Sequence, residues 1–255
     1  IDLISKIFSY GWGYPFTFVN GVVYESNNAS NLYILENLFF KTPEYILGLY
    51  LIFFIYLKNL IKFYSKAVKY FNIKLIFILL NILLPSILLF FNPFAVYDGL
   101  RLFLFILPYY CIIPALVLFY LFKNFKEKFS KILLILISFL SIYYLQNFIK
   151  ITPYHYTYLN FFTGDYSKAN LKFENDYWGT SLKELIIKAN KVSNFRSDRY
   201  IKISVCGVNP KNIKILSKKY SNLKFTIVRP DENPEFVILS NGVLGDYNFK
   251  VKNNM

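Results

Sequence analysis

Four long apolar stretches constrain this chain more than any other feature. They run approximately over Pro43–Phe63, Leu75–Phe91, Leu102–Phe122 and Ile132–Ile149. Each is close to the roughly 20 residues that an α-helix needs to cross a bilayer. Hydrophobic residues make up 55% of the chain, more than an ordinary soluble core requires. We therefore predict four membrane-spanning helices, which Pro85, Pro108 and Pro114 would kink and which would pack on one another.

The links between these stretches differ in charge. The middle link contains Asp98 and Arg101, whereas lysines fill the first and third links: Lys58, Lys62, Lys66, Lys69, Lys74, and Lys123, Lys126, Lys128, Lys131. Under the positive-inside rule the lysine-rich links are cytoplasmic, so residues 1–42, the middle link and everything after Ile149 face outward. The net charge of +14 then reflects topology, and we expect membrane lipid rather than nucleic acid as a partner.

The chain divides into three parts on this basis. Residues 1–42 are expected to form an outer, periplasmic loop partly on the membrane surface, with a short amphipathic helix over Ile1–Tyr10. Residues 43–149 form the transmembrane region, in which Thr42 would cap the first helix and Pro43 would begin it. Residues 150–255 form a membrane-proximal segment and a small domain. The chain does not begin with Met, and we expect a further N-terminal part before it.

The last hundred residues have a mixed polar composition with clear periodicity. "TSLKELIIKANKV" predicts a helix with a capping box formed by Ser181 and Glu184. "YIKISVCG" predicts a strand, "NPKNIKILSKKY" a helix, and "LKFTIVRP" and "PEFVILSNG" two more strands. The predicted fold is a membrane α-helical bundle followed by a small extracytoplasmic α/β domain. Cys111 falls in a span and Cys206 in a strand, so we expect no disulfide between them.

The segment "FNPFAVYDGLRLFLFILP" carries two charges to the edge of an apolar stretch. Asp98 and Arg101 lie three residues apart, a spacing that permits a local ion pair, or a helix cap made by Asp98. A functional interpretation is that Arg101 binds the phosphate of a lipid-linked substrate, since guanidinium offers phosphate paired donors. Asp98 would then orient Arg101 or a sugar hydroxyl.

A second cluster follows the last apolar stretch. The segment after it contains the single histidine of the chain, His155, and then Asp176, Tyr177 and Trp178. Aromatic faces beside carboxylates commonly bind sugars. The alternative is structural, with the aromatic residues forming an interfacial belt and His155 held by hydrogen bonds.

Three motifs in this order carry a family resemblance. "YDGLRLFLFILP", "PYHYTYLN" and "FENDYWGTSLKE" resemble segments of bacterial GT-C membrane glycosyltransferases, relatives of protein O-mannosyltransferases and aminoarabinose transferases. The resemblance extends to about Glu184. It implies an inverting transferase of the cell envelope that moves a sugar from a polyprenyl-phosphate donor to a glycan, lipid or protein acceptor outside the bacterial inner membrane. The substrate-binding residues it implies are Arg101, Asp98, Tyr97, His155, Asp176, Tyr177 and Trp178.

The chain departs from that pattern in two places. Leu102 stands where the group has a histidine, and no position corresponds to the catalytic acidic residue of the group's first outer loop, so the catalytic residue is unknown. No cofactor is evident; some members use a divalent metal, but no ligand spacing here requires one. Two alternatives stay open, a non-catalytic membrane subunit and a lipid-linked glycan transporter or polymerase-like protein, although charged or glycine-interrupted span centres typical of transporters are scarce.

Overall fold

A computed structural model describes residues 16–92, 94–124, 126–176, 179–192, 200–206, 208–220 and 224–239. These residues form two compact units. The first contains Tyr24–Ala169, and the second contains Phe16–Val23 together with the described residues from Asn170 onward.

Four helices of the first unit are long and apolar enough to cross a membrane. They are α3 (Glu44–Tyr64), α4 (Phe71–Phe91), the 3₁₀ segment Arg101–Ile106 continued by α5 (Leu107–Lys123), and α6 (Lys128–Lys150). Large apolar side chains remain exposed along all four helices, as expected where lipid rather than water is the solvent. The predicted spans are thus confirmed as helices of suitable length and composition, and they indicate a membrane-associated protein.

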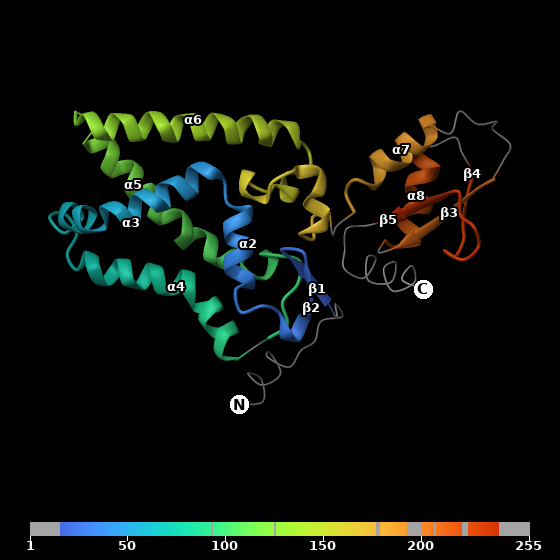
Figure 1. Cartoon of the computed structure of the whole chain (residues 1–255), viewed down its shortest axis with the longest axis horizontal. Coiled ribbons are helices and arrows are strands. Elements are labelled where there is room, and N and C mark those ends of the chain that lie inside the picture. The colour runs from blue at the N-terminus through green and yellow to red at the C-terminus, as the bar shows by residue number, and fades with distance from the viewer. Residues whose placement is uncertain are drawn as a thin grey trace. The chain divides into compact units, whose positions relative to one another are not determined.

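Helices α3 and α5 lie between α4 and α6 (Figure 1). Gly48 lets α3 approach α6 closely, because a Cβ atom there would lie 3.1 Å from Cδ1 of Ile137. Pro114 has no N–H for the carbonyl of Tyr110, four residues earlier on α5. The Tyr50 hydroxyl of α3 donates to that carbonyl at 2.7 Å, so the neighbouring helix satisfies the group that proline leaves open.

Residues before the first span contain regular structure that the sequence analysis did not predict. Strands β1 (Phe16–Val19) and β2 (Val22–Glu25) pair as a hairpin, a short 3₁₀ helix follows (Ser26–Asn28), and α2 covers Tyr33–Lys41. The hairpin turn is Asn20–Gly21, with φ of 50° and 84°. Both residue types tolerate this left-handed backbone, which matches the twist of the strands. The helix predicted over Ile1–Tyr10 lies outside the described residues.

The start of α3 differs from the predicted cap. Pro43 occupies the cap position in an extended conformation, with φ −56° and ψ 146°, and no side chain caps the helix. Thr42 instead ends α2, and its hydroxyl donates to the Tyr110 hydroxyl at 3.2 Å. The prediction that Thr42 caps α3 was therefore wrong, because a tertiary contact with α5 engages its side chain.

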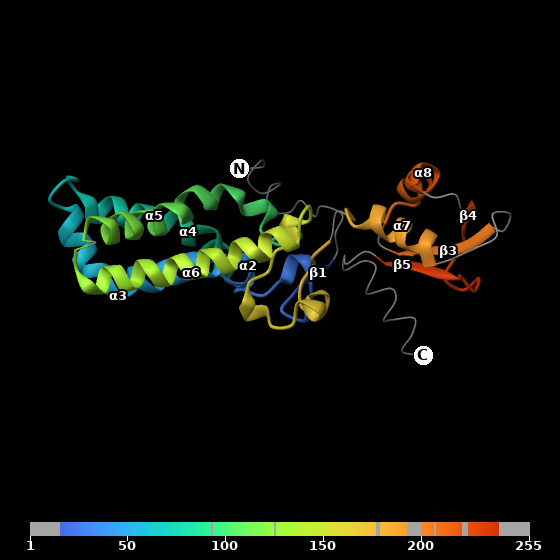
Figure 2. The same cartoon turned by 90° about the horizontal axis from the view of Figure 1, so that it is seen from above.

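The second unit contains a small parallel sheet with two helices. Its elements are α7 (Leu182–Val192), β3 (Tyr200–Cys206), α8 (Pro210–Tyr220), β4 (Lys224–Ile227) and β5 (Phe236–Leu239). The strand order is β4-β3-β5, and both pairings are parallel. Helices α7 and α8 contact each other on one face of the sheet (Figure 2). The predicted α/β region is confirmed, with every element near its expected position.

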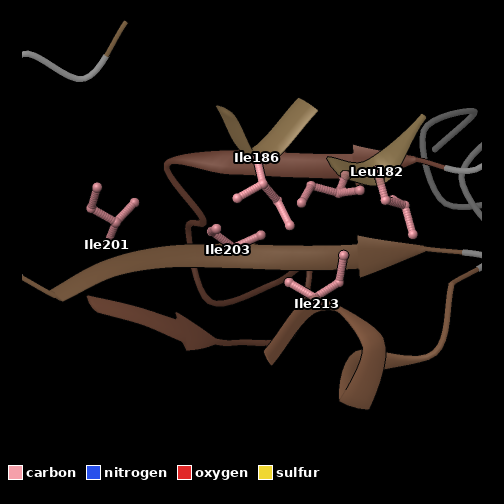
Figure 3. Packing of buried hydrophobic residues seen from close by; sticks show 6 residues of the cluster. Leu182, Ile186, Ile201, Ile203 and Ile213 are labelled. Atoms are coloured by element: carbon pink, nitrogen blue, oxygen red, sulfur yellow. The ribbon is translucent and has the colours of Figure 1, made fainter. Parts of the chain in front are cut away.

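One apolar core holds this unit together (Figure 3). Ile201 and Ile203 of the central strand belong to this core together with Ile186 of α7 and Ile213 of α8, and all four are at most 1% exposed. Lys202, between the two strand isoleucines, is exposed, as the alternation of a strand requires. The apolar sides of both helices therefore pack against the sheet in one core.

Between α6 and α7 the described residues contain three 3₁₀ segments. Those over His155–Thr157 and Phe161–Thr163 lie in the first unit after α6. The third, Tyr166–Leu171, leads into the second unit.

Candidate functional site

The turn before the third apolar helix has an unusual backbone. Asp98 and Gly99 are both left-handed, with φ of 54° and 64°. Asp tolerates this region better than most residues, and Gly adopts it without strain. The Gly99 N–H donates to the hydroxyl of Tyr33 on α2 at 2.9 Å, and Tyr33 is only 1% exposed. The "YDG" sequence thus forms a fixed turn anchored on α2.

Two further side chains of α2 reach this turn. A Cβ atom at Gly99 would meet Nζ of Lys41 and would lie 3.0 Å from Oδ1 of Asn37. Since Nζ is the end of a flexible side chain and can move, the left-handed backbone is the main reason for glycine here. Lys41 and Asn37 were not singled out from the sequence, since nothing in their spacing relates them to a turn more than 50 residues away.

The turn presents Arg101 beside a buried carboxylate. Nη1 of Arg101 lies 3.0 Å from Oδ2 of Asp98; the Asp98 side chain is 6% exposed and that of Arg101 is 44% exposed. The local ion pair considered from the sequence is therefore present. The cap interpretation of Asp98 was wrong, because the 3₁₀ segment begins after Leu100 and has no side-chain cap.

The charges at this site are unequal. Burial raises the pKa of Asp98 above its ordinary value, while the hydrogen bond and charge of Arg101 and the charge of Lys41 act in the opposite direction. Two cations thus accompany one carboxylate, and one of them, Arg101, is almost half exposed. Such an arrangement is suited to binding an anion with paired oxygens. We call Lys41, Asp98 and Arg101 the cationic turn site.

Tyr97 lies within the fold at this site. It is 8% exposed, and the neighbouring Val96 donates its N–H to the carbonyl of Ser26 at 3.1 Å. Its ring therefore offers a ligand little surface, and its position favours packing over substrate contact.

His155 has partners at the end of α6. Its ring stacks on Phe148, with centroids 3.8 Å apart and planes within 3°, and Nε2 lies 2.9 Å from Oγ1 of Thr152. These contacts support the structural interpretation of His155, since both partners lie in the same short stretch of chain.

The side chain of Asp176 caps the start of α7. Its carboxylate accepts the N–H groups of Thr180 and Ser181 at 3.0 and 3.1 Å, and also both hydroxyls. The predicted capping box is thus replaced by Asp176, which takes the Ser181 N–H expected to bond Glu184. Asp176 belongs to the second unit, whereas His155 and Arg101 belong to the first. Tyr177 and Trp178 lie outside the described residues.

Sequence reasoning missed a buried carboxylate at the start of α3. Glu44 is 6% exposed; its Oε2 accepts from the Tyr158 hydroxyl at 2.8 Å and its Oε1 from the Phe161 N–H at 2.7 Å. Burial and the bond to Glu44 raise the pKa of Tyr158. An acidic residue at the start of an apolar helix was a visible signal, but it is equally typical of a favourable helix-dipole interaction.

Asn160 completes this connection. Its side-chain amide donates to the carbonyls of Phe39 and Thr42, and its N–H donates to the carbonyl of Phe40 at 2.8 Å. The segment after α6 is thereby fixed to the link between α2 and α3. We call Glu44, Tyr158 and Asn160 the α3 latch. Two residues of the "PYHYTYLN" motif, Tyr158 and Asn160, therefore have clear structural roles.

Across the described ranges, no three His, Cys, Asp or Glu side chains gather in a way that could hold a metal ion. No known family model, curated protein or solved structure matches this chain.

Proposed function

We propose that this chain belongs to an integral membrane glycosyltransferase of the GT-C type. The reaction would transfer a sugar from a polyprenyl-phosphate donor to an acceptor hydroxyl on the outer side of a bacterial inner membrane. The single observation that carries the proposal is the cationic turn site, where a buried Asp98 holds the exposed Arg101 at the beginning of an apolar helix. The motif resemblance supplies the reaction class.

The location suits a lipid-linked phosphate. A polyprenyl tail favours the apolar helices, whereas its phosphate must stay at the aqueous edge. Arg101 begins the third candidate span, and Lys41 ends α2 just before the first. Under the positive-inside rule both ends face away from the lysine-rich links, on the outer side. The second unit, which follows α6, is proposed to lie on that side too.

The chemistry needs charge stabilisation and a base. The acceptor oxygen attacks the anomeric carbon with inversion while the bond to the phosphate oxygen breaks. Arg101, supported by Lys41, would stabilise the negative charge that returns to the lipid phosphate. Asp98 acts through Arg101, since its buried carboxylate fixes the guanidinium. A general base must take the acceptor proton, and the resemblance puts that base in a loop to which no position here corresponds.

Substitution of Arg101 tests the proposal. In membranes that contain the full-length protein and a lipid-linked sugar donor, Arg101→Ala is expected to insert normally and to lose roughly 100-fold or more in transfer, the usual effect of removing one charge-stabilising donor. Arg101→Lys keeps the charge without paired donors and should be intermediate. Arg229→Ala, which removes an exposed arginine of the second unit, is the control.

Unchanged transfer by Arg101→Ala would refute the phosphate-binding role of the site. Donor binding by the wild-type protein without any transfer would instead favour a non-catalytic membrane subunit.

A further inference from the structure

All charged side chains of helix α8 are positive. Its sequence, "PKNIKILSKKY", contains four lysines and no acidic residue. At about 100° per residue, Lys211, Lys214 and Lys218 fall within a stripe roughly 60° wide. Ile213 and Ser217, which are 0% and 8% exposed, lie outside this stripe, on the buried side of the helix. We call Lys211, Lys214 and Lys218 the α8 lysine stripe.

The environment of the stripe adds to its charge. All three of its lysines are exposed, and among the described residues none of them has an ion-pair partner. Beside it, Lys183 of α7 and Lys219 both lie over the Tyr220 ring, at 4.8 and 5.3 Å from its centroid. A surface that serves solubility usually mixes both signs of charge. On α8 every charged side chain is cationic.

An apolar side chain accompanies the lysines. Ile215 is 63% exposed and lies next to Lys214 on the outer side of α8. Lysines surrounding an exposed aliphatic group are typical of surfaces that meet a lipid headgroup layer, where the charges meet phosphates and the aliphatic group enters the interface.

We propose that the α8 lysine stripe binds the anionic headgroups of a phospholipid bilayer. The four apolar helices of the same chain would hold the second unit at a bilayer, so even weak attraction acts at high effective concentration. Each lysine near an anionic membrane surface raises the partition coefficient of the protein onto that surface roughly fivefold. This surface does not depend on the glycosyltransferase proposal, because it uses neither the cationic turn site nor a sugar donor.

Lysine acylation of the full chain in nanodiscs tests this surface. In discs of phosphatidylcholine with phosphatidylglycerol, the α8 lysine stripe should react about fivefold or more slowly with a water-soluble acetylating ester than in phosphatidylcholine alone. Salt at 1 M, which shortens the Debye length to ~3 Å, should abolish the difference. Lys202, exposed on β3, is the internal control and should react equally in both discs.

Paired variants isolate the charge. Lys214→Gln/Lys218→Gln should remove most of the protection of Lys211 in anionic discs. Lys202→Gln/Arg229→Gln makes the same charge change elsewhere in the unit and should leave that protection intact. Equal reactivity of the stripe in neutral and anionic discs overturns the proposal. Protection that appears only when an oligonucleotide is added also overturns it, and would assign the surface to nucleic acid.

Discussion

The α3 latch offers a sharp test of how the first unit is held together. Glu44→Ala removes the acceptor of two hydrogen bonds, from the Tyr158 hydroxyl and from the Phe161 N–H. A hydrogen bond to a charged group contributes about 1.5–3 kcal/mol. Tyr158 is 8% exposed and cannot recover its bond from water, whereas Phe161 is 62% exposed. We therefore expect a loss of about 3–5 kcal/mol in the free energy of unfolding.

A double-mutant cycle separates the hydroxyl contribution. Tyr158→Phe alone should cost about 1.5–3 kcal/mol, and combining it with Glu44→Ala should add little, so the coupling energy should be of that same size. Unfolding would be followed in mixed micelles at increasing denaturing-detergent fraction. Tyr143→Phe, which removes an exposed hydroxyl from α6, should change stability by no more than about 0.5 kcal/mol.

Additive effects of the two substitutions would refute the reasoning. They would mean that the hydroxyl and the carboxylate do not stabilise each other, and that Glu44 is tolerated for its position at a helix start alone.

Three other predictions follow from the cationic turn site and from α7. Because burial raises the pKa of Asp98, the folded state favours its protonated form; this contribution to stability is fully present below the unfolded pKa of about 4 and is lost as pH rises through the folded value. As pH rises through the folded pKa, wild-type protein should therefore lose stability relative to Asp98→Asn. An infrared band of the protonated carboxyl group, absent from the variant, should report the titration of Asp98. Identical stability–pH profiles of the two proteins would contradict this prediction. Gly99→Ala should cost about 1–2 kcal/mol from its backbone alone, and crosslinking should show Lys41 displaced, since the new Cβ would meet Nζ; full stability would contradict the turn. Asp176→Ala should cost about 1–2 kcal/mol and speed hydrogen exchange in the first turn of α7, with α8 unchanged as the control.

Local pattern was sufficient for much of the architecture. The four apolar helices and the α7-β3-α8-β4-β5 order followed from run length and periodicity, because burial in lipid or in one core imposes a period on neighbouring residues. The hairpin at Asn20–Gly21 was also readable, since Asn-Gly between valines is a strong turn signal. It was missed because the surrounding aromatic residues suggested a membrane-surface loop.

The site was only partly accessible in this way. The sequence alone determined that Asp98 and Arg101 could pair, because three residues of separation bring two side chains together in any compact turn. Tertiary structure decided that Lys41 and Tyr33 join them, that Glu44 meets Tyr158 and that Tyr50 satisfies the carbonyl opposite Pro114. These partners are separated by roughly 60 to 114 residues. A local sequence period cannot predict contacts between residues so far apart in the chain, because the packing of whole helices brings them together.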